Sequence, residues 1–165
     1  MDRSSLKKGI ITRPGIEIDE SGIWFHNKIK IENKNILYYF KKNTIRIDSD
    51  YYIYNQAGKN IEFAVIESVR GFPIFITHVS DIKENILLVG LDYGEEKTVP
   101  FENLLYFNDT TLAAVIPEKN VAARFNGYAM SALMNDLGEN KNGMVTIGKN
   151  NHLIKTARHI DYLNI

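Results

Sequence analysis

The sequence contains no cysteine, which excludes disulfide bonds, thiolate nucleophiles and thiolate metal sites. Its 20 basic and 20 acidic residues give a formal net charge of +0, so no overall field gathers nucleic acid or an anionic membrane. No apolar run approaches the roughly 20 residues that span a bilayer. Residues 1–15 also lack the apolar segment of a signal peptide. We therefore expect a cytoplasmic protein that binds neither nucleic acid nor membrane.

Motifs for catalysis and for cofactor binding are also missing. The four histidines, at positions 26, 78, 152 and 159, do not have the spacing of metal ligands, and no glycine-rich phosphate loop occurs. Without cysteine, nothing supplies three or four converging ligands to a metal ion. We expect no bound metal and no cofactor.

What the sequence does contain is the pattern of an ordinary globular chain. Of its 165 residues, 44% are hydrophobic and 24% are charged. Short stretches with apolar residues at every second position, such as Ile16–Ile18 and Thr44–Asn55, predict half-buried strands. The turns between them are too short for crossover connections, which favours antiparallel pairing. The pattern predicts an α+β fold made mainly of antiparallel sheets.

One helix is expected in each half of the chain. The first should begin after Asn33, whose side chain can cap free amides, and should end at Asn43. The second is expected from Val121 to Leu137, where apolar residues recur at helical spacing. The same element order in both halves suggests a structural repeat. We expect three parts: a basic N-terminal arm over residues 1–14, a first half over 15–84 and a second half over 85–165.

The candidate binding residues of the first half cluster around a predicted turn. Trp24 is the only tryptophan, and His26 and Asn27 follow it between two short strands. Asn27 tolerates positive φ, so a tight hairpin at His26–Lys28 needs no glycine. His26 and Asn27 then either set the turn or present hydrogen-bonding groups to a ligand. Trp24 is either a core anchor or an aromatic wall.

Arg124 is the candidate in the second half. Its expected place is the first turn of an apolar helix, where it would pair with Glu102 or Glu118, or present its guanidinium to a carboxylate or phosphate. If the two halves form a common groove, Arg124 would join Trp24, His26 and Asn27 in one ligand-binding site. An acidic small molecule or a peptide carboxylate suits that set of groups.

A set of residues spread along the chain forms a recognisable pattern. They are Trp24-Phe25-His26-Asn27, Ile31, Phe40 and, more weakly, Asp50–Ile53, Ile61–Phe63, Pro73 and Val121–Phe125. This pattern resembles the DUF1285 family of bacterial proteins. Lys28 stands where the family has a glycine, and Asn33 where it has an arginine. The resemblance implies a two-repeat α+β fold of unestablished function, suspected of binding ligands in signalling.

Three functions are compatible with these observations. We expect a small ligand- or partner-binding module in bacterial regulation. The second hypothesis is a small hydrolase or isomerase that uses His26 with a nearby carboxylate. The third is a structural interaction protein that forms a homodimer through a sheet edge.

Overall fold

The structure is a computed structural model that describes residues 3–83, 85–107, 111–134, 144–147, 150–153 and 155–157. The chain divides into two compact units. Within the described residues, the first unit comprises residues 3–73 and 118–121, and the second comprises residues 74–117 and 122–157.

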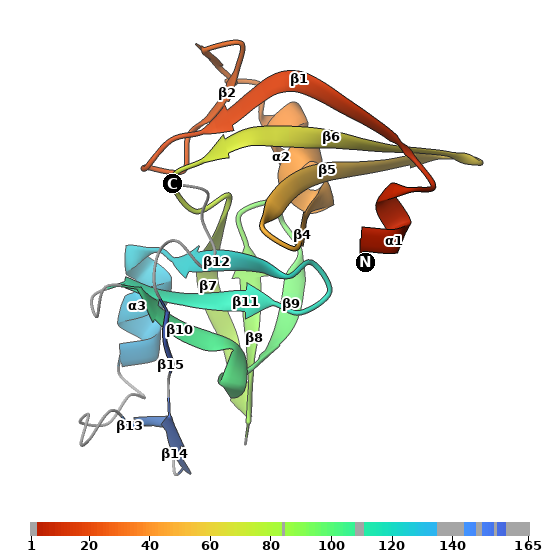
Figure 1. Ribbon diagram of the computed structural model, residues 1–165. Helices are drawn as coiled ribbons and strands as arrows, with labels where there is room; N and C mark the ends of the chain where they lie inside the picture. The colour runs from red at the N-terminus through yellow and green to blue at the C-terminus, as the bar shows by residue number, and fades with distance from the viewer. Residues whose placement is uncertain are drawn as a thin grey trace. The chain divides into compact units, whose positions relative to one another are not determined.

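The first unit contains a six-stranded sheet in the order β3-β2-β1-β6-β5-β4, with α2 between β3 and β4 in the chain (Figure 1). A short helix, α1 (Arg3–Leu6), precedes the sheet. Its other elements are β1 (Ile10–Ile18), β2 (Trp24–His26), β3 (Ile29–Lys30), α2 (Lys34–Asn43), β4 (Thr44–Ile47), β5 (Asp50–Ala57) and β6 (Asn60–Val69).

The second unit contains a seven-stranded sheet in the order β15-β10-β11-β12-β7-β8-β9. A separate two-stranded sheet pairs β13 with β14. The elements are β7 (Ile74–Lys83), β8 (Ile86–Leu91), β9 (Glu96–Pro100), the 3-10 helix η1 (Phe101–Asn103), β10 (Leu104–Phe107), β11 (Thr111–Ile116), β12 (Val121–Phe125), α3 (Gly127–Met134), β13 (Met144–Ile147), β14 (Asn150–Leu153) and β15 (Lys155–Ala157).

The two large sheets repeat one topology. If β1–β6 and β7–β12 are each renumbered from 1 to 6, both sets have the order 3-2-1-6-5-4, and β15 adds a seventh strand beside β10. In both, the first and last strands pair in parallel, β1 with β6 and β7 with β12. The strands β9 and β10 are joined by η1, whereas β3 and β4 are joined by α2. The α+β fold of two halves is confirmed, and its strand order is that of a structural repeat.

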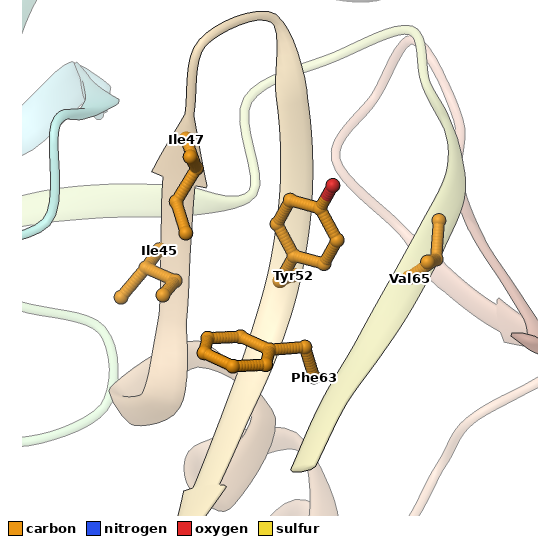
Figure 2. Close-up of a cluster of buried hydrophobic side chains, with 5 residues drawn as sticks. All are labelled: Ile45, Ile47, Tyr52, Phe63 and Val65. Atoms are coloured by element: carbon orange, nitrogen blue, oxygen red, sulfur yellow. The ribbon is translucent and has the colours of Figure 1, made fainter. Parts of the chain in front are cut away.

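The sheet of the first unit is apolar on both faces. Figure 2 shows one face, where Ile45, Ile47, Tyr52, Phe63 and Val65 form a buried cluster across β4, β5 and β6. Leu6 of α1 packs against this cluster. The other face follows from strand alternation and carries buried Ile16, Ile18, Trp24, Tyr51 and Ile66. Phe40 of α2 contacts Trp24 on that face, with 6.0 Å between ring centroids.

The first predicted helix is confirmed, with both ends where the sequence placed them. The Asn33 side chain accepts from the amides of Asn35 and Ile36, and α2 ends at Asn43. The second prediction is wrong over its first five residues, because Val121–Phe125 forms strand β12. The helix α3 begins only at Gly127. Asn126, which precedes it, accepts from the Ala129 amide through its side-chain oxygen. The predicted end at Leu137 lies outside the described residues.

Two further expectations differ from the structure. Pairing is mainly antiparallel, but β1–β6, β7–β12 and β10–β15 are parallel, so the first half is not all antiparallel as predicted. The expected boundary between residues 84 and 85 falls between the paired strands β7 and β8, while the units separate after Pro73. The expected arm over residues 1–14 contains α1 and the first residues of β1.

Among the described residues, no helix has the length and apolar character needed to cross a membrane.

Candidate binding site in the first unit

The β2–β3 hairpin presents His26 and Asn27 at its tip. Asn27 and Lys28 both have positive φ, 50° and 66°, which a two-residue type I′ turn requires. Ile31 donates its amide to the Trp24 carbonyl at 2.9 Å, and His26 is paired with Ile29. The predicted hairpin at His26–Lys28 is confirmed, and it forms without glycine.

Gly15 on β1 holds this tip in place. Its carbonyl accepts from the Asn27 amide at 2.8 Å, and its own amide donates to Glu67 Oε1 at 3.2 Å. A Cβ on Gly15 would lie 2.2 Å from Asn27 Oδ1, and the φ of Gly15 is +72°. Both the close approach and the left-handed backbone therefore require glycine. The tip is bonded on two sides, by β3 and by β1.

Trp24 anchors the hairpin to the core of the first unit. It is 1% exposed, and its indole Nε1 donates to the Pro73 carbonyl at 3.2 Å. With Phe40 against its ring, this side chain is enclosed by the core of the first unit. Its position matches the core anchor that the sequence allowed, and it supports the strand that leads to His26 and Asn27.

His26 lies at the rim of the same sheet face. Side chains two apart on a strand point the same way, so His26 projects on the side of Trp24 and α2. Its cross-strand neighbours are Ile16, which is 3% exposed, and Ile29, which is 73% exposed. The imidazole thus stands at the border between the buried core and solvent.

The imidazole is paired with the neighbouring amide. Asn27 Nδ2 lies 3.2 Å from His26 Nε2. When the amide donates to Nε2, the neutral ring carries its proton on Nδ1 and can donate it to an acceptor. Asn27 Oδ1 remains an acceptor above Gly15. The tip therefore offers adjacent directional hydrogen-bonding groups.

The charged groups near His26 are the lysines of its own hairpin. Lys28 and Lys30 are both exposed. Within the described part of the chain, no carboxylate lies within ion-pair distance of His26. The arrangement suits an anionic group brought by a ligand better than proton transfer by an internal pair.

Arg124 belongs to the second unit, on strand β12. It is exposed, while Ala123 and Phe125 on either side of it are buried. It is therefore a surface residue of a sheet, and not part of the first turn of a helix as predicted. Its place in a common site with the three hairpin residues stays a prediction.

Sequence reasoning missed a polar cluster on the second sheet. The His78 ring lies across Gly90 of β8, where a Cβ would be 1.9 Å from the imidazole. Its Nε2 is 3.8 Å from Glu96 Oε1 on β9, and Ser80 donates to that same oxygen at 2.6 Å. The signal was Gly90 inside a strand, which indicates close approach of another group. The cluster links β7 to β9 across β8.

The described surface of the second unit includes two hollows that are not lined by a predicted site residue. The larger, about 340 Å³, is lined by Asn85, Ile86, Pro100, Phe101 and Glu102. The smaller, about 280 Å³, is lined by Val79–Ile82 and Ala132. Among the described residues, no three metal-ligating side chains converge.

Comparison with known proteins supports the fold alone. No protein-family model matches the sequence, and no curated protein matches it. Two solved structures are similar. One is a DUF1285 family protein from Silicibacter pomeroyi DSS-3, with a TM-score of 0.67 and 14% identity, covering 88% of this chain and 82% of its own. The other is a DUF1285 family protein from Shewanella baltica OS155, with a TM-score of 0.58 and 15% identity, covering 74% of this chain and 91% of its own. The chain therefore has a DUF1285-like fold.

Proposed function

We propose that this chain is a small binding module of bacterial regulation, located in the cytoplasm, which recognises a carboxylate on an acidic small molecule or peptide. The observation that carries the proposal is the fixed, exposed His26–Asn27 pair. Its backbone is bonded to β1 and β3, and its side chains face solvent. A site whose groups are held in place loses little conformational entropy on binding.

The chemistry of the tip favours an anion. In the tautomer whose Nε2 accepts from Asn27 Nδ2, the Nδ1–H of His26 can donate to a carboxylate oxygen. Lys28 and Lys30 of the hairpin are exposed cations, and the Glu67 carboxylate accepts from the Gly15 amide beside the tip. Arg124 would add a second cation if the two units bring it to the same ligand.

The hydrolase or isomerase hypothesis has less support. It requires a carboxylate beside His26, and within the described residues Asn27 is the side chain that contacts the imidazole. The homodimer hypothesis meets an obstacle at β9. Leu91 donates its amide to the Glu95 carbonyl, and Phe101 donates its amide to the Asn85 carbonyl, so the odd-numbered residues of β9 bond to β8. The even-numbered residues face the outer edge, and one of them, Pro100, has no N–H to offer a second strand.

Thermal-shift screening with short-chain dicarboxylates and with short peptides that have free C-termini tests the proposal. Ligand present at about 100 times its Kd adds roughly 2.7 kcal/mol of stability. We expect a carboxylate compound to raise the Tm of the wild type, and the C-terminal amide of a binding peptide to lose that effect.

Two substitutions separate the site from the fold. Asn27→Gly keeps the positive φ and removes the amide, and His26→Ala removes the imidazole. Both should fold normally and lose the shift. His78→Ala is the control, since it removes an exposed histidine from the second unit. Equal ligand shifts in wild type, Asn27→Gly and His26→Ala would refute the assignment. Arg124→Ala measures whether the second unit contributes.

A further inference from the structure

The strand β1 is covered by β2 over only part of its length. Pairs with β2 extend from Ile16 to Ile18, and the Gly15–Asn27 hydrogen bond is the last contact before the hairpin turns away. The segment Ile10–Thr12 pairs with β6 on its other side. Figure 1 shows β2 beside the C-terminal part of β1 only. Within the described residues, no strand pairs with the remaining edge of Ile10–Thr12.

The repeat supplies an internal comparison for this gap. In the second unit, β8 occupies the place of β2 and runs beside β7 from Lys83 to Ile76. Beyond β8, the Asp92 amide donates to the Phe75 carbonyl at 2.9 Å. Pairing beside β7 therefore extends from Lys83 to Phe75, a longer run than the pairing of β2 with Ile16–Ile18 of β1. The first unit stops at the type I′ turn of Asn27 and Lys28.

The side chains along the gap differ from those of a protected edge. Ile10 is 66% exposed and Ile11 is 51% exposed, although they are successive residues that point to opposite faces. Natural edge strands usually carry charges or proline to prevent pairing with another chain. Here proline comes only at Pro14, after the open segment.

Charge decides between possible occupants. Lys7 and Lys8 precede the open segment and Arg13 follows it, and all three are exposed. Antiparallel pairing of two copies through this segment would bring the basic groups of both copies together, which is destabilising. A strand with acidic side chains would gain from the same groups. The edge therefore fits a partner of opposite charge better than a second copy.

We propose that the open edge of Ile10–Thr12 binds an extended acidic peptide segment of a partner protein by strand addition. The peptide occupies the lane of β2, end to end with the hairpin, and its backbone pairs with β1. If it runs parallel to β1, its C-terminal end meets His26 and Asn27. Only this last feature, recognition of a terminal carboxylate, rests on the function proposed above; strand addition stands without it.

Selection from a displayed library of short random peptides, with the whole chain as bait, provides the probe. We expect enriched peptides to be acidic, and their synthetic forms to bind less tightly as salt is raised, because exposed charges are screened. The double variant Lys7→Glu/Lys8→Glu should weaken binding at least about tenfold, or 1.4 kcal/mol. Lys34→Glu is the matched control, at an exposed position in the first turn of α2.

Two proline variants test the edge itself. Consecutive amides of a strand point to opposite edges, so of Ile10→Pro and Ile11→Pro one removes a bond to β6 and the other removes an outward N–H. The variant that keeps the wild-type Tm is the one that has lost only the outward N–H. Its Kd for the peptide should rise at least about tenfold. Should both variants unfold, backbone amide shifts of labelled wild type, titrated with the selected peptide, locate the contact instead.

The outcomes separate the two proposals. Shifts at Ile10–Thr12 that persist in His26→Ala support strand addition and count against the hairpin site. Shifts confined to the hairpin and abolished by His26→Ala overturn strand addition and leave the function proposed above intact. Enrichment of basic or neutral peptides, or equal binding by the proline variant that keeps the wild-type Tm, overturns strand addition as well. Dimerisation through this segment in sedimentation would also overturn it.

Discussion

The two units share one strand order, but the first strand is paired along more of its length in the second unit than in the first. In the second unit, β8 and β9 contain six and five residues, and His78, Ser80 and Glu96 link β7 to β9. In the first, β2 and β3 contain three and two residues. The helices differ in the same direction: α3 buries Ala129 and Leu133, whereas α2 buries no residue. From this comparison we expect α2 and the β2–β3 hairpin to be less firmly packed than α3 and β8–β9, and we propose that binding belongs to the first unit.

Truncating one leucine in each helix gives the largest expected difference. Leu133 is 0% exposed, so Leu133→Ala leaves a cavity and should cost about 2–5 kcal/mol. Leu37 of α2 is half-buried, so Leu37→Ala should cost about 1 kcal/mol, since it already meets water. Chemical denaturation of both variants checks the pair. Equal losses would show that α2 is packed as firmly as α3, and the comparison would fail.

Alanine in place of the tight glycines should also separate the units. Gly15→Ala places a residue with a side chain in the left-handed region, which costs about 1–2 kcal/mol. Its Cβ also displaces the side-chain oxygen of Asn27. At Gly90 the obstructing atoms belong to the His78 ring, which can rotate away. Gly90→Ala should therefore cost at most about 1 kcal/mol. Thermal melts give both values. If Gly90→Ala proves the more damaging variant, the hairpin tip is not the rigid element described above.

Lys28 provides a change of the opposite sign. Its φ of 66° disfavours any side chain, so Lys28→Gly should stabilise the first unit by about 1 kcal/mol. Asn120 in the connection before β12 also has positive φ, 53°, but asparagine tolerates it, so Asn120→Gly should change stability by only a few tenths of a kcal/mol. Melting temperatures decide the point. A loss of stability in Lys28→Gly would contradict the turn geometry.

The smallest effect concerns alkaline pH. Burial, followed by the Asp50 charge, raises the pKa of Tyr52, and burial raises the pKa of Tyr106. Because the unfolded tyrosines ionise first, near pH 10, the fold should lose stability as pH rises from there through the higher folded pKa values. Tyr52→Phe and Tyr106→Phe should each reduce that loss slightly in alkaline denaturation curves. A steeper alkaline loss in either variant would mean that the tyrosine is ionised in the folded protein.

The sequence predicted most local structure because local signals were sufficient for it. Alternation located the strands, Asn33 and Asn43 marked the ends of α2, and Asn27 predicted the hairpin. It failed at Val121–Phe125, a short apolar run that suits a strand and a helix equally. Pairing with Ile74–Ile76 of β7 selects the strand. Parallel pairing of β1 with β6 joins segments about fifty residues apart, which no local pattern encodes.

The candidate site was only partly visible for the same reason. His26 and Asn27 were found because turn chemistry is local. The contact of Asn27 with Gly15 and the open edge of Ile10–Thr12 depend on where β2 ends relative to β1. The exposed Ile10 and Ile11 looked like part of a polar arm. Only the register of β1 with β2 and β6 shows that Ile10–Thr12 is paired on one side within the described residues.

Amide hydrogen exchange of the free protein tests the central claim most directly, because it reports on each strand without any ligand. We expect at least one amide within Ile10–Thr12 to exchange as fast as an amide in an exposed turn, while the amide of Glu17, which pairs with Phe25 of β2, and those of β7 paired with β8 exchange slowly. Uniformly slow exchange from Ile10 to Ile18 would show that this edge is covered, and would contradict the claim that β1 is paired along less of its length than β7.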